Sequence, residues 1–268
     1  MKNIYPFLVA ILYFGCHADE KKPESNAGNS NAAETISQEA EPFAVVELYS
    51  SEGCSDCPPA EEVLNKITHE AMASKTYVYP LAFHVDYWNK LGWKDVFSDS
   101  SYSNRQRKYR VAMKNEVVYT PQTIVNGQVQ FVGSDEKRSR AVIDSFLTVK
   151  PGWFFTIHPD ESQLEKGIIR TEYEIVKRPE EKESRTYSIC FALVERKLET
   201  DVTRGENKGK KLQHENIVRF FSSQELRSGK GEYTVNYPAG KIGKNHSLII
   251  FVQDAASMKI VGANLWNF

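Results

Sequence analysis

The sequence predicts an α/β domain followed by an all-β domain. Three observations lead to this prediction. Buried-strand patterns alternate with helical spacing in the first part of the folded chain, an Asn-Gly pair there separates two apolar runs, and only short strand-like runs follow residue 150. The chain has 268 residues, an ordinary length for two domains.

The charges of the chain nearly cancel, with 34 Lys and Arg residues against 35 Asp and Glu residues. Such a chain has no basic field that would attract nucleic acid or an anionic membrane surface. Hydrophobic residues make up 41% of the chain and aromatic residues 12%, which is enough to build a core. The composition therefore predicts no nucleic-acid partner and excludes wholesale disorder.

Residues 1–16 have the pattern of a bacterial export signal. A positive start at Lys2 precedes an apolar run, Ile4 to Gly15, that is shorter than the roughly 20 residues of a membrane-spanning helix. The run ends at Cys16, which predicts a lipoprotein signal peptide with Cys16 as the lipidated residue; plain secretion with an incidental cysteine is the alternative. Either way we expect an extracytoplasmic protein, as a membrane-anchored lipoprotein in the periplasm or at the cell surface, where disulfides persist.

Residues 17–42 are polar and lack apolar periodicity, so they predict a flexible linker. Residues 43–150 then form the predicted α/β domain. Its expected elements are a strand at 44–50, a helix with apolar positions from Ala60 to Ala71, a strand at 77–87, a polar helix at about 99–113, strands at 117–125 and 128–132, and a helix from Ser134 to about Val149. Because Asn126-Gly127 is a strong hairpin signal, the last two strands should pair antiparallel.

Residues 151–268 predict an immunoglobulin-like β-sandwich of six or seven strands. The strand-like runs are 154–158, 167–176, 186–194, 232–237, 247–253 and 260–266. The charged stretch from Arg196 to Lys211 predicts a solvated loop. Cys190 lies in a strand-like run, and we expect a buried thiol that behaves as a small hydrophobic residue.

The main chemical signal is the pair Cys54 and Cys57, two residues apart between a buried strand and the first helix. A cysteine at a helix N-terminus lies where the helix dipole favours a thiolate, and the second cysteine is within disulfide reach. Pro58 and Pro59 fit the first helical turn. The same spacing also occurs in metal sites. A zinc site, however, needs further Cys or His residues at similar spacing, and none lies near this pair. The pair therefore predicts a redox-active disulfide and no other cofactor.

His84 and Asp86 alternate along the second strand and share a face at its carboxyl end, where ligand sites of α/β proteins gather. We expect them either to hold the aromatic insertion from Trp88 to Trp93 in place through hydrogen bonds, or to help a metal or a proton. Trp88 and Trp93 are expected to cover the dithiol or to pack in the core.

Motifs along the whole folded chain match a single family pattern. They are Val46 to Ala60, Phe83 to Asn89, Leu91-Gly-Trp93, Arg105-Gln106, Tyr119 to Gly127, Gly205-Glu-Asn207 and His214 to Arg219. Together they resemble the thioredoxin superfamily and, within it, a family of secreted bacterial proteins classed as a domain of unknown function. The resemblance implies an α/β thioredoxin-like N-terminal domain at 43–150, followed by an all-β immunoglobulin-like sandwich at 151–268.

The resemblance also implies site residues. Pro121 matches the cis-proline that opens the strand facing the dithiol, and Thr120 precedes it. Glu47 matches the buried acid that handles the proton of the second cysteine; a strand residue turned partly to solvent is the alternative. The negative charges of Asp56 and Glu52 disfavour a thiolate at the first cysteine, which predicts a moderate to reducing potential.

The leading hypothesis is an extracytoplasmic thiol-disulfide oxidoreductase in which Cys54 attacks a substrate disulfide and Cys57 resolves the mixed disulfide. The expected partners are protein or peptide thiols and disulfides, and the membrane through the lipid on Cys16. One alternative is a copper-binding or metallochaperone module in which Cys54, Cys57 and His84 hold Cu(I). The other is a binding module in which the disulfide is structural.

Overall fold

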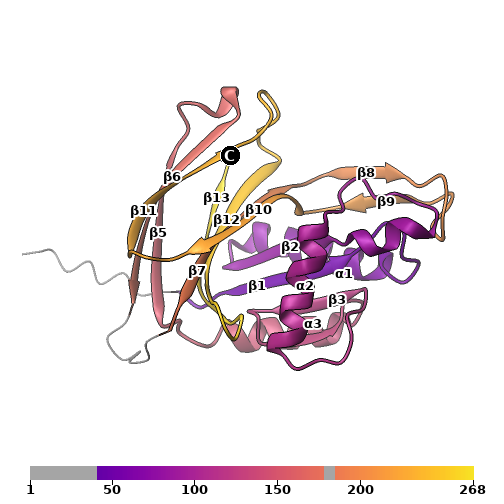
Figure 1. Ribbon diagram of the computed structural model, residues 1–268, viewed down its shortest axis with the longest axis horizontal. Coiled ribbons are helices and arrows are strands. Elements are labelled where there is room, and N and C mark those ends of the chain that lie inside the picture. The colour runs from indigo at the N-terminus through magenta and orange to yellow at the C-terminus, as the bar shows by residue number, and fades with distance from the viewer. Residues whose placement is uncertain (1–40, 178–184) are drawn as a thin grey trace, which may run out of the picture. The chain divides into compact units, whose positions relative to one another are not determined.

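A mixed sheet of eight strands forms the centre of the computed structural model, which describes residues 41–177 and 185–268 (Figure 1). In sheet order the strands are β13 (Ile260–Asn267), β12 (His246–Asp254), β7 (Tyr187–Glu195), β10 (Ile217–Glu225), β2 (Val78–His84), β1 (Ala44–Ser50), β3 (Gln122–Val125) and β4 (Val129–Val132). The predicted signal peptide with Cys16, and the predicted linker up to residue 40, lie outside the described residues.

The predicted fold class is wrong. We expected an α/β thioredoxin-like domain followed by a separate immunoglobulin-like sandwich, but strands from both parts of the chain belong to one sheet. The strand β10, which the sequence patterns did not predict, makes this connection. Its first residue, Ile217, pairs in parallel with Ala82 of β2, and the strand then runs antiparallel to β7.

Helices cover both faces of the β1–β2 part of the sheet. They are α1 (Pro58–Ser74), α2 (Ser100–Ala112), α3 (Glu136–Phe146) and the short 3-10 helix η1 (Asp86–Leu91). Alternate residues of β1 point to opposite faces, so Leu48 packs with the apolar stripe of α1 and with α3, whereas Tyr49 packs with Tyr102 and Tyr109 of α2. None of the helices in the described part of the chain is long and apolar enough to cross a membrane.

Two smaller sheets complete the described chain. The strands β5 (Trp153–Asp160), β6 (Ile168–Lys177, after the short 3-10 helix η2, Leu164–Lys166) and β11 (Lys230–Asn236) form an antiparallel sheet that faces β7 and β12 (Figure 1). Phe191, Ile250 and Ile169 belong to the apolar core between these layers. The strands β8 (Leu198–Asp201) and β9 (Lys211–His214) pair as a hairpin, where the sequence predicted only a solvated loop.

The hairpin predicted at Asn126-Gly127 is confirmed. Strands β3 and β4 pair antiparallel, with Val125 opposite Val129. Both turn residues have positive φ angles, 48° and 63°, which Asn and Gly adopt at low cost. The Asn126 side chain also accepts a 2.7 Å hydrogen bond from the N–H of Val45 and so fixes the turn against β1.

Candidate functional site

The cysteine pair lies where the loop after β1 enters α1. Cys54 and Cys57 are joined by a disulfide, and Cys57 is the N-cap of α1, with Pro58 and Pro59 in the first turn. The positive end of the helix dipole favours a negative sulfur at this position. Cys54 is only 1% exposed and Cys57 is 0% exposed, so the disulfide is covered in this structure.

Thr120 lies directly against the first cysteine. The Thr120–Pro121 peptide bond is cis, as the sequence predicted. The Thr120 hydroxyl donates a hydrogen bond to Cys54 Sγ at 3.4 Å and accepts one from the indole N–H of Trp88 at 2.7 Å. The structure thus brings Cys54, Cys57 and Thr120-Pro121 together, and Trp88 of the aromatic insertion holds the threonine in place.

Glu47 lies on the face of β1 that carries α2, where it forms a buried ion pair with Arg105. The guanidinium donates to both carboxylate oxygens, from Nε at 2.7 Å and from Nη2 at 2.9 Å. The hydroxyls of Tyr49 and Tyr109 donate to the same carboxylate. Burial opposes the charge of Arg105, but the Glu47 carboxylate outweighs it and raises the pKa of the guanidinium. Glu47 is therefore buried. Its carboxylate accepts hydrogen bonds from Arg105, Tyr49 and Tyr109 and not from the dithiol.

His84 belongs to a group of buried ionisable side chains, which we call the histidine cluster. Its members are Glu52, Glu61, His84, Asp95 and His214. His84 at the end of β2 places Nδ1 2.7 Å from Asp95 Oδ2 and Nε2 3.5 Å from Glu61 Oε1. His214 at the end of β9 contacts Glu61 Oε2 through Nδ1 and lies 3.3 Å from Glu52 Oε1 through Nε2. Each imidazole therefore lies between two carboxylates.

The members of the histidine cluster stabilise one another's charged forms. Burial lowers the pKa of His84, but the carboxylates of Asp95 and Glu61 outweigh burial and raise this pKa above its ordinary value. The same competition, against Glu61 and Glu52, raises the pKa of His214 to about 10. Burial raises the pKa of Glu61, yet the two imidazoles bring it below its ordinary value. These opposing effects are typical of buried, mutually paired groups.

Hydrogen bonds connect the histidine cluster to the dithiol loop. The N–H of Glu52 donates to Asp95 Oδ2 at 2.8 Å, and the Glu52 carboxylate accepts from the indole of Trp93 at 2.7 Å. Glu61 follows Cys57 by one helical turn, and its N–H donates to the Cys57 carbonyl at 3.1 Å. The cluster and the dithiol are therefore held by the same loop and the same helix turn.

The loop between β8 and β9 covers the dithiol loop. The fully buried amide of Asn207 donates 2.8 Å hydrogen bonds to the carbonyl oxygens of Glu52 and Cys54. The Glu206 carboxylate accepts a 3.1 Å hydrogen bond from the N–H of Ser55. Buried backbone carbonyls need such donors. The β8–β9 loop therefore fixes the backbone on either side of the first cysteine.

The sequence interpretation missed the histidine cluster and the role of Asn207. Two signals pointed toward them. Residues one helical turn apart share a helix face, which places Glu61 beside Cys57, and both Asn207 and His214 lie in motifs that the family resemblance already contained. What the sequence lacks is any local sign that these segments meet.

Asp86 and Cys190 contact residues that belong neither to the histidine cluster nor to the dithiol. Asp86 accepts a hydrogen bond from the Ser103 hydroxyl of α2 and does not join His84. Cys190 is a free, fully buried cysteine whose sulfur lies 3.4 Å from the Ser223 hydroxyl. Burial raises the pKa of its thiol, which matches the expected inert strand cysteine.

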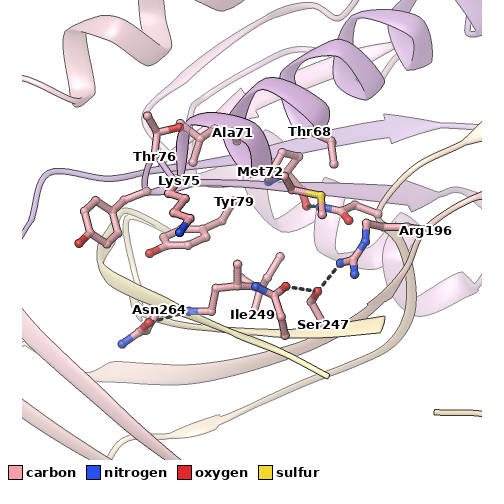
Figure 2. A pocket seen from close by; sticks show the side chains of 16 residues that line it. Thr68, Ala71, Met72, Lys75, Thr76, Tyr79, Arg196, Ser247, Ile249 and Asn264 are labelled. Carbon is pink, nitrogen blue, oxygen red and sulfur yellow. Dashed lines mark hydrogen bonds between the residues drawn. The ribbon is translucent and has the colours of Figure 1, made fainter. Parts of the chain in front are cut away.

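A cavity of about 370 Å³ opens near the C-terminal end of α1 (Figure 2). Its walls include Lys75, Tyr79, Arg196 and Ser247, and Figure 2 shows Arg196 hydrogen-bonded to Ser247. The lining contains no residue of the dithiol or of the histidine cluster. The cavity is therefore separate from the chemistry described above.

Fold and site together define a mixed-sheet protein with a covered C-x-x-C disulfide at a helix N-terminus. The chain belongs to the DUF1223 family, described as protein of unknown function, whose model matches residues 45–253. No curated protein matches the chain.

Solved structures share this architecture. The crystal structure of a protein from Agrobacterium tumefaciens is similar at 27% identity and a TM-score of 0.61, over 86% of this chain and 96% of that one. HBP35 of Porphyromonas gingivalis is similar at 12% identity and a TM-score of 0.59, over 85% of this chain and 76% of that one, a likeness that shows the fold alone. A domain of the outer membrane lipoprotein Omp28 from Porphyromonas gingivalis matches at 10% identity over 45% of this chain and 90% of that one. Its TM-score of 0.28 is too low to indicate a shared fold.

Proposed function

We propose that this protein is an extracytoplasmic thiol-disulfide oxidoreductase with Cys54 and Cys57 as its redox-active pair. The observation that carries the proposal is the contact between the Thr120 hydroxyl and Cys54 Sγ, beside a proline that has no N–H. A C-x-x-C pair at a helix start, opposite a Thr-Pro step, is the local arrangement found in exchange proteins of the thioredoxin superfamily. The proposal uses this local likeness and not the overall fold.

The chemistry consists of two thiol-disulfide exchanges. The Cys54 thiolate attacks one sulfur of a substrate disulfide, so that a mixed disulfide forms and the other substrate sulfur leaves as a thiolate. The Cys57 thiolate then attacks Cys54 Sγ, which closes the Cys54–Cys57 disulfide and releases the second substrate thiolate. Two electrons pass from the dithiol to the substrate. The disulfide in the structure is the oxidised form, which takes two electrons back from a donor dithiol.

The expected partners are proteins or peptides that carry thiols or disulfides, and the reaction needs no cofactor besides the disulfide. Because Cys54 is covered, a substrate sulfur reaches it only after neighbouring groups move, and we propose that the β8–β9 loop, which contacts the Cys54 backbone, is the segment that moves. The hydrogen bonds of Asn207 and Glu206 to the dithiol loop must then break.

The proposed location is the outer side of a bacterial membrane, with the chain anchored through a lipid on Cys16. The support for this comes from the sequence pattern of residues 1–16, since these residues lie outside the described structure. An oxidising compartment is also where a dithiol of this kind finds disulfide substrates.

The reduction potential of the cysteine pair tests the proposal. The full chain is equilibrated in glutathione buffers, and thiols are trapped and assigned by peptide mass spectrometry. A potential between about −120 and −270 mV supports an exchange protein, whereas a value below about −300 mV identifies a structural disulfide and favours a binding module. Exchange with a peptide disulfide should be lost in Cys54→Ser and kept in the control Cys190→Ser; unchanged exchange in Cys54→Ser overturns the assignment.

A further inference from the structure

Three side chains of the histidine cluster direct ligand atoms into one small volume. One ligand atom from each of Glu61, His84 and His214 lies within 4.8 Å of the others, and all three residues are buried. The separation between His84 Nε2 and Glu61 Oε1 is 3.5 Å. Two ligands about 2.1 Å from a tetrahedral zinc ion are about 3.4 Å apart. The spacing of this pair therefore suits a metal ion with little movement.

The outer nitrogens of both histidines face carboxylates. His84 Nδ1 lies 2.7 Å from Asp95, and His214 Nε2 lies 3.3 Å from Glu52. A metal-binding histidine almost always gives its second ring nitrogen to such a partner, which fixes the tautomer and the ring orientation. The inner nitrogens, Nε2 of His84 and Nδ1 of His214, are left facing Glu61. Both histidines thus have a carboxylate on their outer side, and the contact of His84 with Asp95 is a hydrogen bond, whereas that of His214 with Glu52 is an ion-pair contact only.

One of these inner nitrogens has no hydrogen-bond partner within the described residues. His84 Nε2 is buried and makes no hydrogen bond, although it lies 3.5 Å from Glu61 Oε1, and the residue is 0% exposed. A buried polar atom without a hydrogen bond is costly, and a cation that displaces the proton of Nε2 and binds the neutral imidazole would supply the missing interaction. The ring of Phe97 packs edge-on against both imidazoles, with centroid distances of 5.7 and 5.4 Å. This packing helps to fix the orientation of both rings.

A surface cavity lies beside the histidine cluster. A cavity of about 280 Å³ is lined by His214 together with Asn65, His69 and Glu215, at the contact between α1 and the β8–β9 hairpin. An entry path is one of the requirements for a credible metal site. Because the His214 side chain is fully buried, an ion entering from this cavity reaches it only after neighbouring side chains move.

We propose that Glu61, His84 and His214 bind a divalent transition-metal ion, with zinc as the ion that suits them best. Two imidazole nitrogens and one carboxylate oxygen form a known type of zinc ligand set, whereas Ca²⁺ and Mg²⁺ take oxygen ligands. The ligands come from α1, β2 and β9, so the ion would fix the β8–β9 hairpin onto the helix that carries the dithiol. The cysteines are not ligands, and the site goes beyond the proposed exchange function.

The test uses the full chain, stripped with a strong chelator and then titrated with Zn²⁺ or Co²⁺. We expect the protein to retain one equivalent of metal after gel filtration, and Co²⁺ to show tetrahedral absorption bands without a thiolate charge-transfer band. His84→Gln and His214→Gln should each weaken Zn²⁺ binding at least about 100-fold, beyond the 10–100-fold typical of outer-shell changes. The matched control is His69→Gln, because His69 lines the same cavity but pairs with Glu215 at 3.0 Å.

The double variant Cys54→Ser, Cys57→Ser separates this proposal from the thiol chemistry. It should lose disulfide exchange and keep the bound zinc. Circular dichroism reports whether the histidine variants fold; if they do not, the Co²⁺ spectrum of the wild type and the zinc content of the cysteine variant decide. The proposal is overturned if the wild type retains neither metal, if His69→Gln loses binding to the same extent, or if removing the cysteines abolishes binding.

Discussion

The side-chain amide of Asn207 donates a 2.8 Å hydrogen bond to the carbonyl oxygen of Cys54. The same nitrogen donates to the carbonyl of Glu52 at 2.8 Å, and the residue is fully buried. One side chain of the β8–β9 loop therefore satisfies two backbone groups of the loop that carries the first cysteine. This contact joins the two parts of the chain at the proposed reactive bond.

Asn207→Ala should make the disulfide easier to reach. Each lost hydrogen bond contributes about 0.5–1.5 kcal/mol, and 1.4 kcal/mol corresponds to a factor of about ten. We expect dithiothreitol to reduce the Cys54–Cys57 disulfide roughly tenfold faster than in the wild type, measured by thiol trapping over time. Asn65→Ala is the control, since Asn65 donates to the Gln213 carbonyl at an exposed position of the same hairpin. Equal rates in wild type and Asn207→Ala would show that the loop does not limit access.

Thr120→Val should slow exchange without unfolding the protein. Valine keeps the shape of threonine but removes the hydroxyl that contacts Cys54 Sγ, and it leaves the Trp88 indole without its acceptor. A hydrogen bond of this kind contributes about 1 kcal/mol, so kcat/KM for a peptide disulfide should fall about fivefold. Thr120→Ser, which keeps the hydroxyl, should restore most of the rate. If Thr120→Ser is as slow as Thr120→Val, the hydroxyl is not what matters.

Glu47→Gln should lower stability more than activity. The substitution leaves the Arg105 guanidinium buried without its carboxylate, and breaking a buried ion pair in this way costs about 3–5 kcal/mol. Urea unfolding should report this loss, while peptide-disulfide exchange by the folded variant stays near the wild-type rate. Glu62→Gln, at an exposed position of α1, should change neither. A variant that is stable but slow, with a shifted pH profile, would instead make Glu47 the proton-handling acid that the family resemblance implied.

Cys190 should resist alkylation in the native protein. Burial raises the pKa of its thiol, and only the thiolate is reactive. At pH 8 the thiol stays protonated, so iodoacetamide should leave Cys190 unmodified until urea unfolds the chain, as peptide mass spectrometry can show. Labelling should increase as the pH approaches the raised pKa. Rapid labelling of the folded protein at pH 8 would identify Cys190 as an accessible thiol.

The parts of the structure that the sequence predicted are those that depend on neighbouring residues. The strand β1, the helices α1 and α2 and the hairpin at Asn126-Gly127 follow from apolar spacing and turn chemistry. The cis bond at Thr120-Pro121 was predicted from the motif Tyr119 to Gly127, which resembles the family pattern. Even here the ends were imprecise: the strand expected at 117–125 begins only at Gln122.

The rest depends on contacts between distant segments. The strand β10 begins with the largely apolar run from Ile217 to Phe221 and ends in polar residues up to Glu225, so its pattern favours a strand but does not show that the strand lies inside a large sheet. Its pairing with β2 and β7 decides its structure, and that pairing overturned the predicted fold class. The histidine cluster escaped prediction for the same reason, because Glu61, His84 and His214 meet only in the folded chain.

The position of β10 next to β2 also covers an edge of β2 that would otherwise be open. The Ala82 N–H donates to the Asn216 carbonyl at 2.9 Å, and the Asn216 side chain donates to the Pro80 carbonyl at 2.9 Å. A chain ending at residue 150 would lose these partners and would present β2 as an open edge, which is a template for pairing with another molecule. Phe83 would also lose its ring contact with Phe221. The second half of the chain thus closes a sheet edge of the half that carries the cysteines, and a fragment without it should aggregate more readily.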